Sequence, residues 1–140
     1  MDLKKAICSL FEVQAGPDGV QHIVTPITYA RTSSRVVVRV RQRGNAYAID
    51  ENRGAGFHAS MAGGDVESEV IARWADELSS TGSITLQDGT LSANTTDPQL
   101  IAPLIFRVAE AAQKLHAISI SQAQRQAHGL EARFSSAPFS

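Results

Sequence analysis

Residues 35–41 read Arg-Val-Val-Val-Arg-Val-Arg, and this run is the clearest strand pattern in the chain. Side chains of a strand alternate between the two faces of a sheet, so Val36, Val38 and Val40 point to one face. The other face carries Val37 and the arginines at positions 35, 39 and 41. One apolar face and one wet face are typical of an antiparallel sheet, and we therefore expect one here.

Shorter alternating segments lie on both sides of this run. Further strands are predicted in residues 20–29, 46–49, 83–86 and 91–93. Asp88-Gly89 is a hairpin turn signal between the last two of these segments. Pro26 interrupts the first, and because proline has no N–H to donate, this strand should lie at a sheet edge or be broken there.

Helices are predicted where apolar residues recur every three or four positions. Such stripes run from Leu3 to Phe11, from Val66 to Leu78 and from Ile101 to Leu115. Gly82 stops the second helix, and Asp65, Glu67 and Glu69 crowd its first turn. Asp97 and Pro98 give the last helix an N-cap and a first-turn proline. Pro103 should either distort its first turn or delay regular helix to near Leu104.

The order of these elements is α-β-β-β-α-β-β-α, which predicts a single α+β domain with an antiparallel sheet packed by helices. Residues 50–64 carry four glycines and are expected to form a mobile loop. The domain should comprise residues 1–118. Residues 119–140 are rich in Ser, Gln and Ala and are expected to be a partly disordered tail, in which Gly129 argues against a long helix.

The composition is that of a globular chain of 140 residues, with 43% hydrophobic residues, 19% charged residues and a net charge of −1. No stretch approaches the roughly 20 apolar residues of a membrane span, and residues 1–5 do not resemble a signal peptide. The single Cys8 excludes a disulfide framework and a thiolate-rich zinc site. We expect a cytoplasmic protein with no membrane partner.

Motifs of the common enzyme classes are absent from the sequence. The histidines are His22, His58, His116 and His128, and no two of them have metal-ligand spacing. We therefore predict a protein that is not an enzyme, with no catalytic residue, no cofactor and no metal. One alternative stays open, a metal-dependent enzyme that uses Asp50, Glu51 and His58 around a divalent ion.

Charge is distributed unevenly along the chain. From Arg31 to Arg53 the net charge is +4, and from Gly54 to Asp97 it is −6. The partner-binding candidates are Arg35, Arg39, Arg41 and Arg43. They indicate either an anion-binding stripe or a solvated sheet face whose arginines pair with acids of a neighbouring strand or helix.

Another protein is the favoured partner, because it can match a basic stripe and an acidic helix within one interface. The alternative is a nucleic acid bound by the arginine-rich strand, although no aromatic residues lie between the arginines for base stacking. A homodimer is also expected. Val24, Ile27 and Tyr29 beside Pro26, and the alanine-rich outer faces of the helices, are the surfaces considered for it.

Two segments resemble a known family. Residues 22–29 read His-Ile-Val-Thr-Pro-Ile-Thr-Tyr, and residues 47–50 read Tyr-Ala-Ile-Asp. Together with the valine-rich strand between them, they resemble the bacterial and prophage family called domain of unknown function 1828, over roughly Ala6 to Leu115. The chain departs from that pattern after Ile49, where the expected glycine is displaced to Gly54. The resemblance implies a bacterial or prophage cytoplasmic setting and no particular activity.

The element order also resembles, more weakly, that of type III secretion chaperones, small dimeric proteins that hold an unfolded effector segment. We therefore expect a non-enzymatic protein-binding module of bacterial or prophage origin. Such a module would be chaperone-like or would inhibit a host defence complex such as a phage-defence or CRISPR assembly. The element order is an analogy of architecture, since fold does not determine function.

Overall fold

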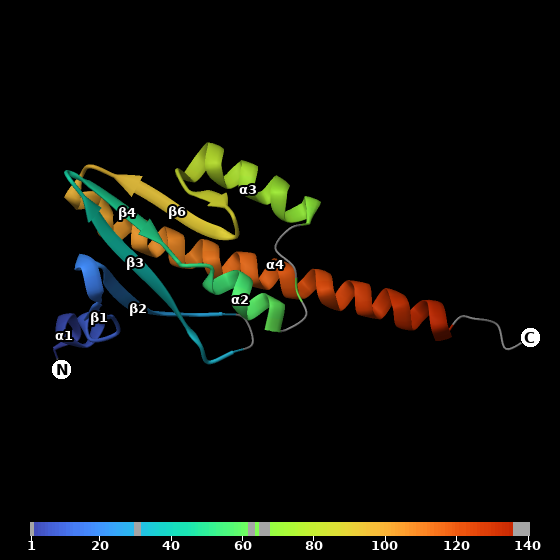
Figure 1. The fold of residues 1–140 in the computed structure, drawn as a ribbon. Coiled ribbons are helices and arrows are strands. Elements are labelled where there is room, and N and C mark those ends of the chain that lie inside the picture. Colours follow the sequence, from blue (N-terminus) through green and yellow to red (C-terminus); the bar gives the residue numbers. More distant parts are fainter. Residues whose placement is uncertain (1, 30–31, 62–63, 65–67, 136–140) are drawn as a thin grey trace, which may run out of the picture.

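Six strands form one open antiparallel sheet in the order β1-β2-β3-β4-β6-β5 (Figure 1). The strands are β1 (Glu12–Ala15), β2 (Gln21–Thr28), β3 (Arg35–Arg43), β4 (Ala46–Asp50), β5 (Thr85–Gln87) and β6 (Thr90–Thr95). The helices are α1 (Leu3–Cys8), α2 (Gly54–Met61), α3 (Glu69–Gly82) and α4 (Ile101–Ser135), with 3-10 turns at Pro17–Gly19 and Pro98–Leu100. This computed structural model describes residues 2–29, 32–61, 64 and 68–135, without the side chains of residues 82 and 124–135.

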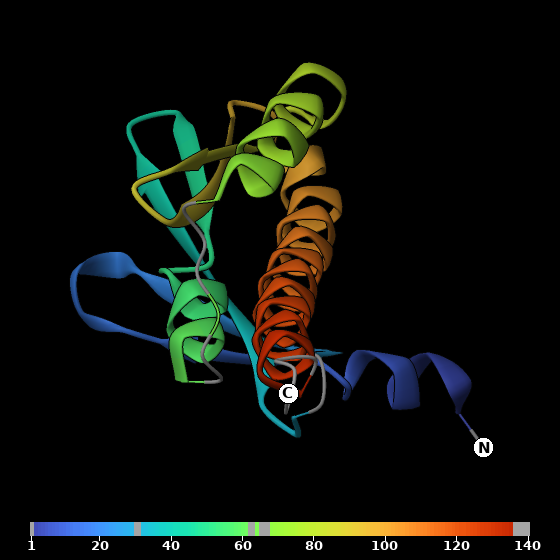
Figure 2. The same cartoon turned by 90° about the vertical axis from the view of Figure 1, so that its right-hand side faces the viewer.

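Helix α4 crosses one face of the sheet and forms the core with it. Val36 and Val38 of β3 are fully buried, as are Val108 and Leu115 of α4. Each such side chain contributes roughly 1.5–3 kcal/mol relative to an exposed position. Figure 2 shows α3 and α4 on the same side of the sheet and no described helix over the opposite face. The predicted α+β fold with an antiparallel sheet is confirmed, including the division of β3 into a buried and a wet face.

The N-terminal segment differs from the predicted single helix. Helix α1 ends at Cys8, and residues 12–15 form an additional edge strand, β1, which pairs with β2. Phe11, the last residue of the predicted stripe, instead packs edge-on against Phe106 of α4 with ring centroids 5.2 Å apart. The stripe continues in sequence after Cys8, but the backbone changes to extended structure because β2 offers a pairing partner.

The predicted mobile loop at residues 50–64 contains helix α2 instead. Ala55 and Ala59 are fully buried, and α2 packs along α4. Small residues at these positions let the helix approach its neighbour closely, and a Cβ at Gly54 would collide with the Tyr29 hydroxyl. Glycine here therefore permits packing, whereas the sequence analysis took it as a sign of a loop.

Both prolines in question are accommodated locally. Strand β2 is not an edge strand, but its pairing with β3 shifts register between Val24 and Thr28, so the predicted break at Pro26 is present. Strand β1 reaches only to Val24, and Pro26 therefore has no partner strand on that side. Pro103 lies in the first turn of α4, directly after a 3-10 turn whose N-cap Asp97 accepts from the Gln99 N–H at 3.0 Å.

The start of α3 and the end of α4 also differ from prediction. Helix α3 begins at Glu69 with Ser68 as N-cap, and residues 65–67 lie outside the described residues. Helix α4 continues to Ser135 through most of the predicted tail, and Ser119 and Ile120 are buried. The many Ala and Gln residues favour helix, and one interior Gly129 costs only about 1 kcal/mol. No described helix is long and apolar enough to span a membrane.

Candidate functional site

The open face is the sheet surface turned away from α4, and strand register determines which residues share it. One row of directly paired positions crosses five strands, from Gln14 through His22, Arg39 and Asp50 to Ser92. A second row pairs Arg41 with Ala48 and Asn94, and a third pairs Arg43 with Ala46. The arginines of β3 are therefore in the middle of the sheet, flanked by small or polar side chains.

Asp50 holds two of these arginines. Its carboxylate accepts from Arg39 Nε at 2.8 Å and from Arg41 Nη2 at 3.2 Å, and also from the Asn52 N–H at 3.0 Å. The Asp50 side chain is 5% exposed, while the side chains of Arg39 and Arg41 are 24% and 34% exposed. The solvent-facing surface is thus guanidinium, and the compensating carboxylate lies beneath it. Two fixed cations share one anion, which leaves the cluster net positive and already ordered for a ligand.

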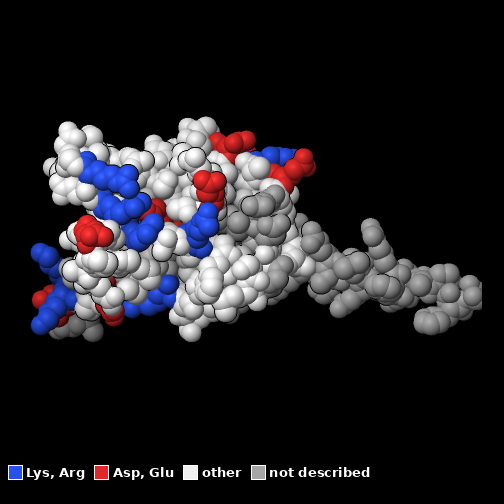
Figure 3. Space-filling view, in the orientation of Figure 1, with Lys and Arg blue, Asp and Glu red and all other residues white. Residues whose placement is uncertain are grey.

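The other two candidate arginines behave differently from this pair. Arg43 is exposed at the end of β3. Arg35 donates from Nε to the Thr25 carbonyl at 2.7 Å and from Nη2 to the Leu10 carbonyl, and it lies 3.6 Å from Glu12. Arg35 therefore ties the N-terminal segment to β2 and β3. Of the predicted set, Arg39, Arg41 and Arg43 remain for a ligand, and Figure 3 shows basic side chains gathered over this region.

A polar pocket of about 190 Å³ lies at the α2 end of the open face. Its lining consists of His22, Tyr29, Arg35, Val37, Arg39, Glu51, Asn52, Gly54 and His58. Arg39 contributes to both the pocket and the Asp50 cluster, so the two are continuous. The pocket is large enough for a single carboxylate or similar small anionic group.

Glu51 lines this pocket and links the end of β4 to α2 and to β6. It is 2% exposed, and its two carboxylate oxygens accept from the Ala55 N–H at 2.9 Å and the Leu91 N–H at 3.1 Å. Burial raises the pKa of this carboxyl group, the backbone donors oppose that rise, and Asp50 adds to it. Asn52 and Arg53, which follow, both have left-handed φ values of 50° and 62°. Glu51 therefore fixes the start of α2 to β6 across a strained turn.

Asp50, Glu51 and His58 do not converge on one point. Asp50 is bound by arginines on the open face, and both Glu51 oxygens are bound by backbone N–H groups. Within the described part of the chain no group of three His, Cys, Asp or Glu side chains is placed to hold a metal ion. Glu51 and His58 do share the pocket, but they lack the third ligand that the metal-dependent alternative needs.

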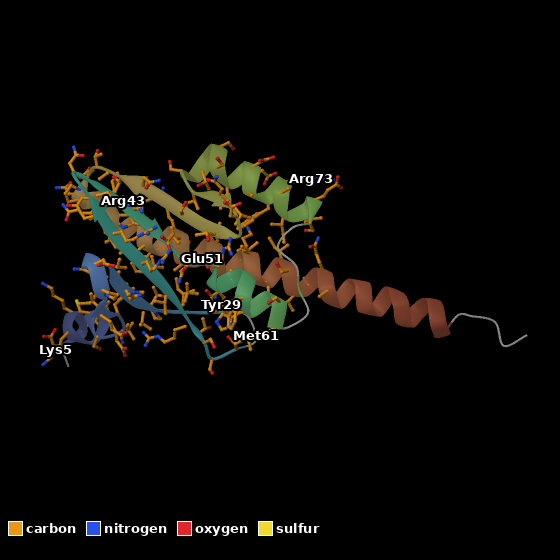
Figure 4. All side chains as sticks on the ribbon, viewed as in Figure 1. Lys5, Tyr29, Arg43, Glu51, Met61 and Arg73 are labelled. Atoms are coloured by element: carbon orange, nitrogen blue, oxygen red, sulfur yellow. The ribbon has the colours of Figure 1, made fainter. Side chains whose placement is uncertain are left out.

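An aromatic cluster lies beneath the pocket. The Tyr29 ring stacks on His58 with centroids 4.4 Å apart and lies 5.2 Å from the ring of His116. Burial raises the pKa of the Tyr29 hydroxyl, and the nearby Glu51 adds to this rise. Figure 4 shows Tyr29 and Glu51 beside α2. Tyr29 is buried in the core and Ile27 is half-buried against it, which leaves exposed Pro26 and half-buried Val24 of the dimer surface considered there.

His116 is the buried polar member of this cluster. It is fully buried, and neither ring nitrogen has a hydrogen-bond partner among the described residues. Burial, and secondarily His58, lower the pKa of His116. Sequence reasoning missed the cluster because its members are far apart along the chain and no local motif connects them. The side chain of His128, the remaining histidine, lies outside the described residues.

The fold and the site define a small α+β domain with one bare sheet face, a cationic cluster fixed by a shielded carboxylate and an adjoining polar pocket. Comparisons with protein-family models, with curated proteins and with solved structures found no match. The resemblances noted from the sequence stay predictions.

Proposed function

We propose that this chain is a non-enzymatic protein-binding module whose open face binds an acidic segment of another protein. The observation that carries the proposal is the pair Arg39 and Arg41, held by the shielded carboxylate of Asp50, with exposed Arg43 beside them. Because the guanidinium groups are already positioned, the arginine side chains lose little conformational entropy when they bind a carboxylate.

Several features favour protein over nucleic acid as the partner. The described open-face positions of the paired strands include no Phe, Tyr or Trp on which a base could stack. Glu69, Asp76 and Glu77 are exposed on α3, on the α4 side of the sheet, and would repel a long polyanion that wrapped around the domain. An acidic peptide needs to contact only the cationic cluster.

A sheet edge suggests how such a segment could be held. Strand β5 is the sheet edge away from α1, and an extended peptide can add to such an edge through backbone hydrogen bonds. This mode suits a chaperone-like role toward an unfolded segment, and inhibition of a host defence complex would use the same face on a folded partner. We also propose that the chain forms a homodimer and acts in the cytoplasm of a bacterial or phage-infected cell.

The test measures fluorescence anisotropy of two labelled probes, a 15-residue peptide of alternating Glu and Val and a 20-nucleotide single-stranded DNA. The variant combines Arg39→Gln, Arg41→Gln and Arg43→Gln with Asp50→Asn, so that no buried carboxylate is left unpaired. The matched control, Arg107→Gln with Lys114→Gln on exposed positions of α4, changes the net charge by the same two units.

Peptide affinity should fall at least tenfold in the open-face variant and stay within twofold of wild type in the control. The salt dependence of binding should also flatten. Lysate capture with and without nuclease then identifies natural partners. Absence of peptide binding to the wild type, or arginine-dependent binding of the DNA alone, would overturn the protein-partner proposal, and the second result would support the nucleic-acid alternative.

A further inference from the structure

Helix α1 is an arm that its own domain does not cover. Leu3, Ile7 and Leu10 form one apolar stripe, yet they are 64%, 50% and 48% exposed, and no α1 residue is buried. Figure 2 shows α1 projecting away from the sheet, on the α4 side. A six-residue helix is too short to be stable in water by itself, so this stripe needs a packing partner.

Further exposed apolar side chains lie on the adjoining β1 and on α4, where Phe11 contacts Phe106, and we define the α1 patch as Leu3, Ile7, Leu10, Val13 and Phe106. Val13 is 64% exposed on the edge strand β1, and Phe106 is 42% exposed on α4. At typical side-chain areas these five residues leave on the order of 450 Å² of apolar surface in water. A stable dimer buries about 800 Å² per partner, of which roughly 60% is apolar, and the patch therefore matches one half of such an interface.

The charges around the α1 patch favour a second copy as its occupant. Asp2 and Glu12 are acidic, Lys4 and Lys5 are basic, and all four are exposed. The rim carries both signs of charge, with Arg35 already beside Glu12, so acidic groups of one copy can face basic groups of the other. The open face has the opposite property, because two copies of its arginine cluster would repel each other.

We infer that the α1 patch is the interface of a homodimer, in which the α1 helices of two copies pack together beside their β1 edges. This inference rests on the homodimer that is part of the proposed function, and it adds the surface that is used. The arrangement leaves both arginine clusters outside the interface, because the open face and the α1 patch are separate surfaces.

The first test is the molar mass of the full chain by light scattering at about 50 µM. Wild type should give twice the 15.0 kDa of one chain. Leu3→Ser with Ile7→Ser should give a monomer. The matched control, Phe57→Ser with Met61→Ser, removes two comparably exposed apolar side chains of α2, at 61% and 72%, and should remain dimeric.

The single cysteine provides a second readout. Cys8 is exposed on α1, and a six-residue helix is only about 9 Å long. Two α1 helices packed at an interaxial distance of 8–10 Å therefore place their cysteines within about 15 Å of each other. A bismaleimide of that span should crosslink wild type and the α2 control, but neither Cys8→Ser nor the Leu3→Ser, Ile7→Ser variant.

A monomeric wild type at 50 µM, or a dimer that survives the α1 change, would overturn the inference. Circular dichroism of the α1 variant should show a folded domain, since Leu3 and Ile7 are exposed within the chain. Its affinity for the Glu-Val peptide should stay within twofold of wild type. A monomeric wild type that still binds the peptide thus contradicts this inference and the proposed homodimer but leaves the open-face proposal standing, and a dimer without peptide binding contradicts only the open-face proposal.

Discussion

Asp50 and Glu51 are adjacent buried carboxylates, but they belong to different regions of the molecule. Asp50 faces the open sheet surface and is compensated by the side chains of Arg39 and Arg41. Glu51 faces the start of α2 and is compensated by backbone donors of Ala55 and Leu91. The first arrangement leaves cations at the surface, and the second joins helix to sheet. Neighbouring acids therefore take unrelated roles, according to which groups the fold places around them.

The largest expected effect concerns Glu51. Glu51→Ala should lower the free energy of unfolding by about 3 kcal/mol, because two buried N–H groups lose their acceptor at roughly 1–3 kcal/mol each. Glu51→Gln should cost about half as much, since its amide keeps one acceptor oxygen. Urea denaturation measures both variants. A glutamine variant as unstable as the alanine variant would contradict a role based on accepted hydrogen bonds.

A double-mutant cycle on Arg39 and Asp50 tests the other carboxylate. We expect a coupling energy of about 1–2 kcal/mol, because the Asp50 carboxylate is shielded from water and the contact is 2.8 Å. The same cycle on Arg35 and Glu12 is the reference. Their separation is 3.6 Å, and the Glu12 side chain is 58% exposed, so the coupling should stay below about 0.5 kcal/mol. Equal couplings would mean that burial of Asp50 does not strengthen the open-face cluster.

The smallest expected effect is on the pH dependence of stability, to which Glu51 and buried His116 contribute with opposite signs. The pKa of His116 is lowered from 6.5 by burial, so below pH 6.5 the unfolded chain takes up the proton more readily and stability falls. The raised pKa of Glu51 acts in the opposite direction. The stability that Glu51 contributes is fully present below pH 4.5 and is lost as the pH rises through the pKa of Glu51 in the folded chain. Thermal unfolding between pH 8 and pH 5 measures the balance.

His116→Leu should flatten the loss of stability on acidification below pH 6.5 and should change the pH 8 value less than the pH 5 value. Leucine fills a similar volume without a polar atom, so the buried site keeps its packing. A variant with the same pH slope as wild type would show that His116 is not the group responsible.

Local signals in the sequence predicted most of the fold, but they missed elements whose formation depends on contacts with distant segments. Alternation in residues 35–41 identified the central strand and its two faces, and Asp97 identified the cap that precedes α4. Helix α2 was missed because Gly54 is typical of loops, whereas here its missing side chain makes room for Tyr29. Strand β1 was missed because four residues in extended form are recognisable only beside β2.

The site was predictable to a similar extent. The sequence determined that arginines 35, 39 and 41 share a face, since alternation along a strand is a property of the backbone alone. Only the tertiary structure decided that Asp50 binds Arg39 and Arg41, that Arg35 is diverted to Thr25 and Leu10, and that Glu51 points elsewhere. These outcomes depend on strand register and on which groups become buried. Periodicity is local and can be read from neighbouring residues, but charge compensation depends on contacts that form only when distant segments pack together.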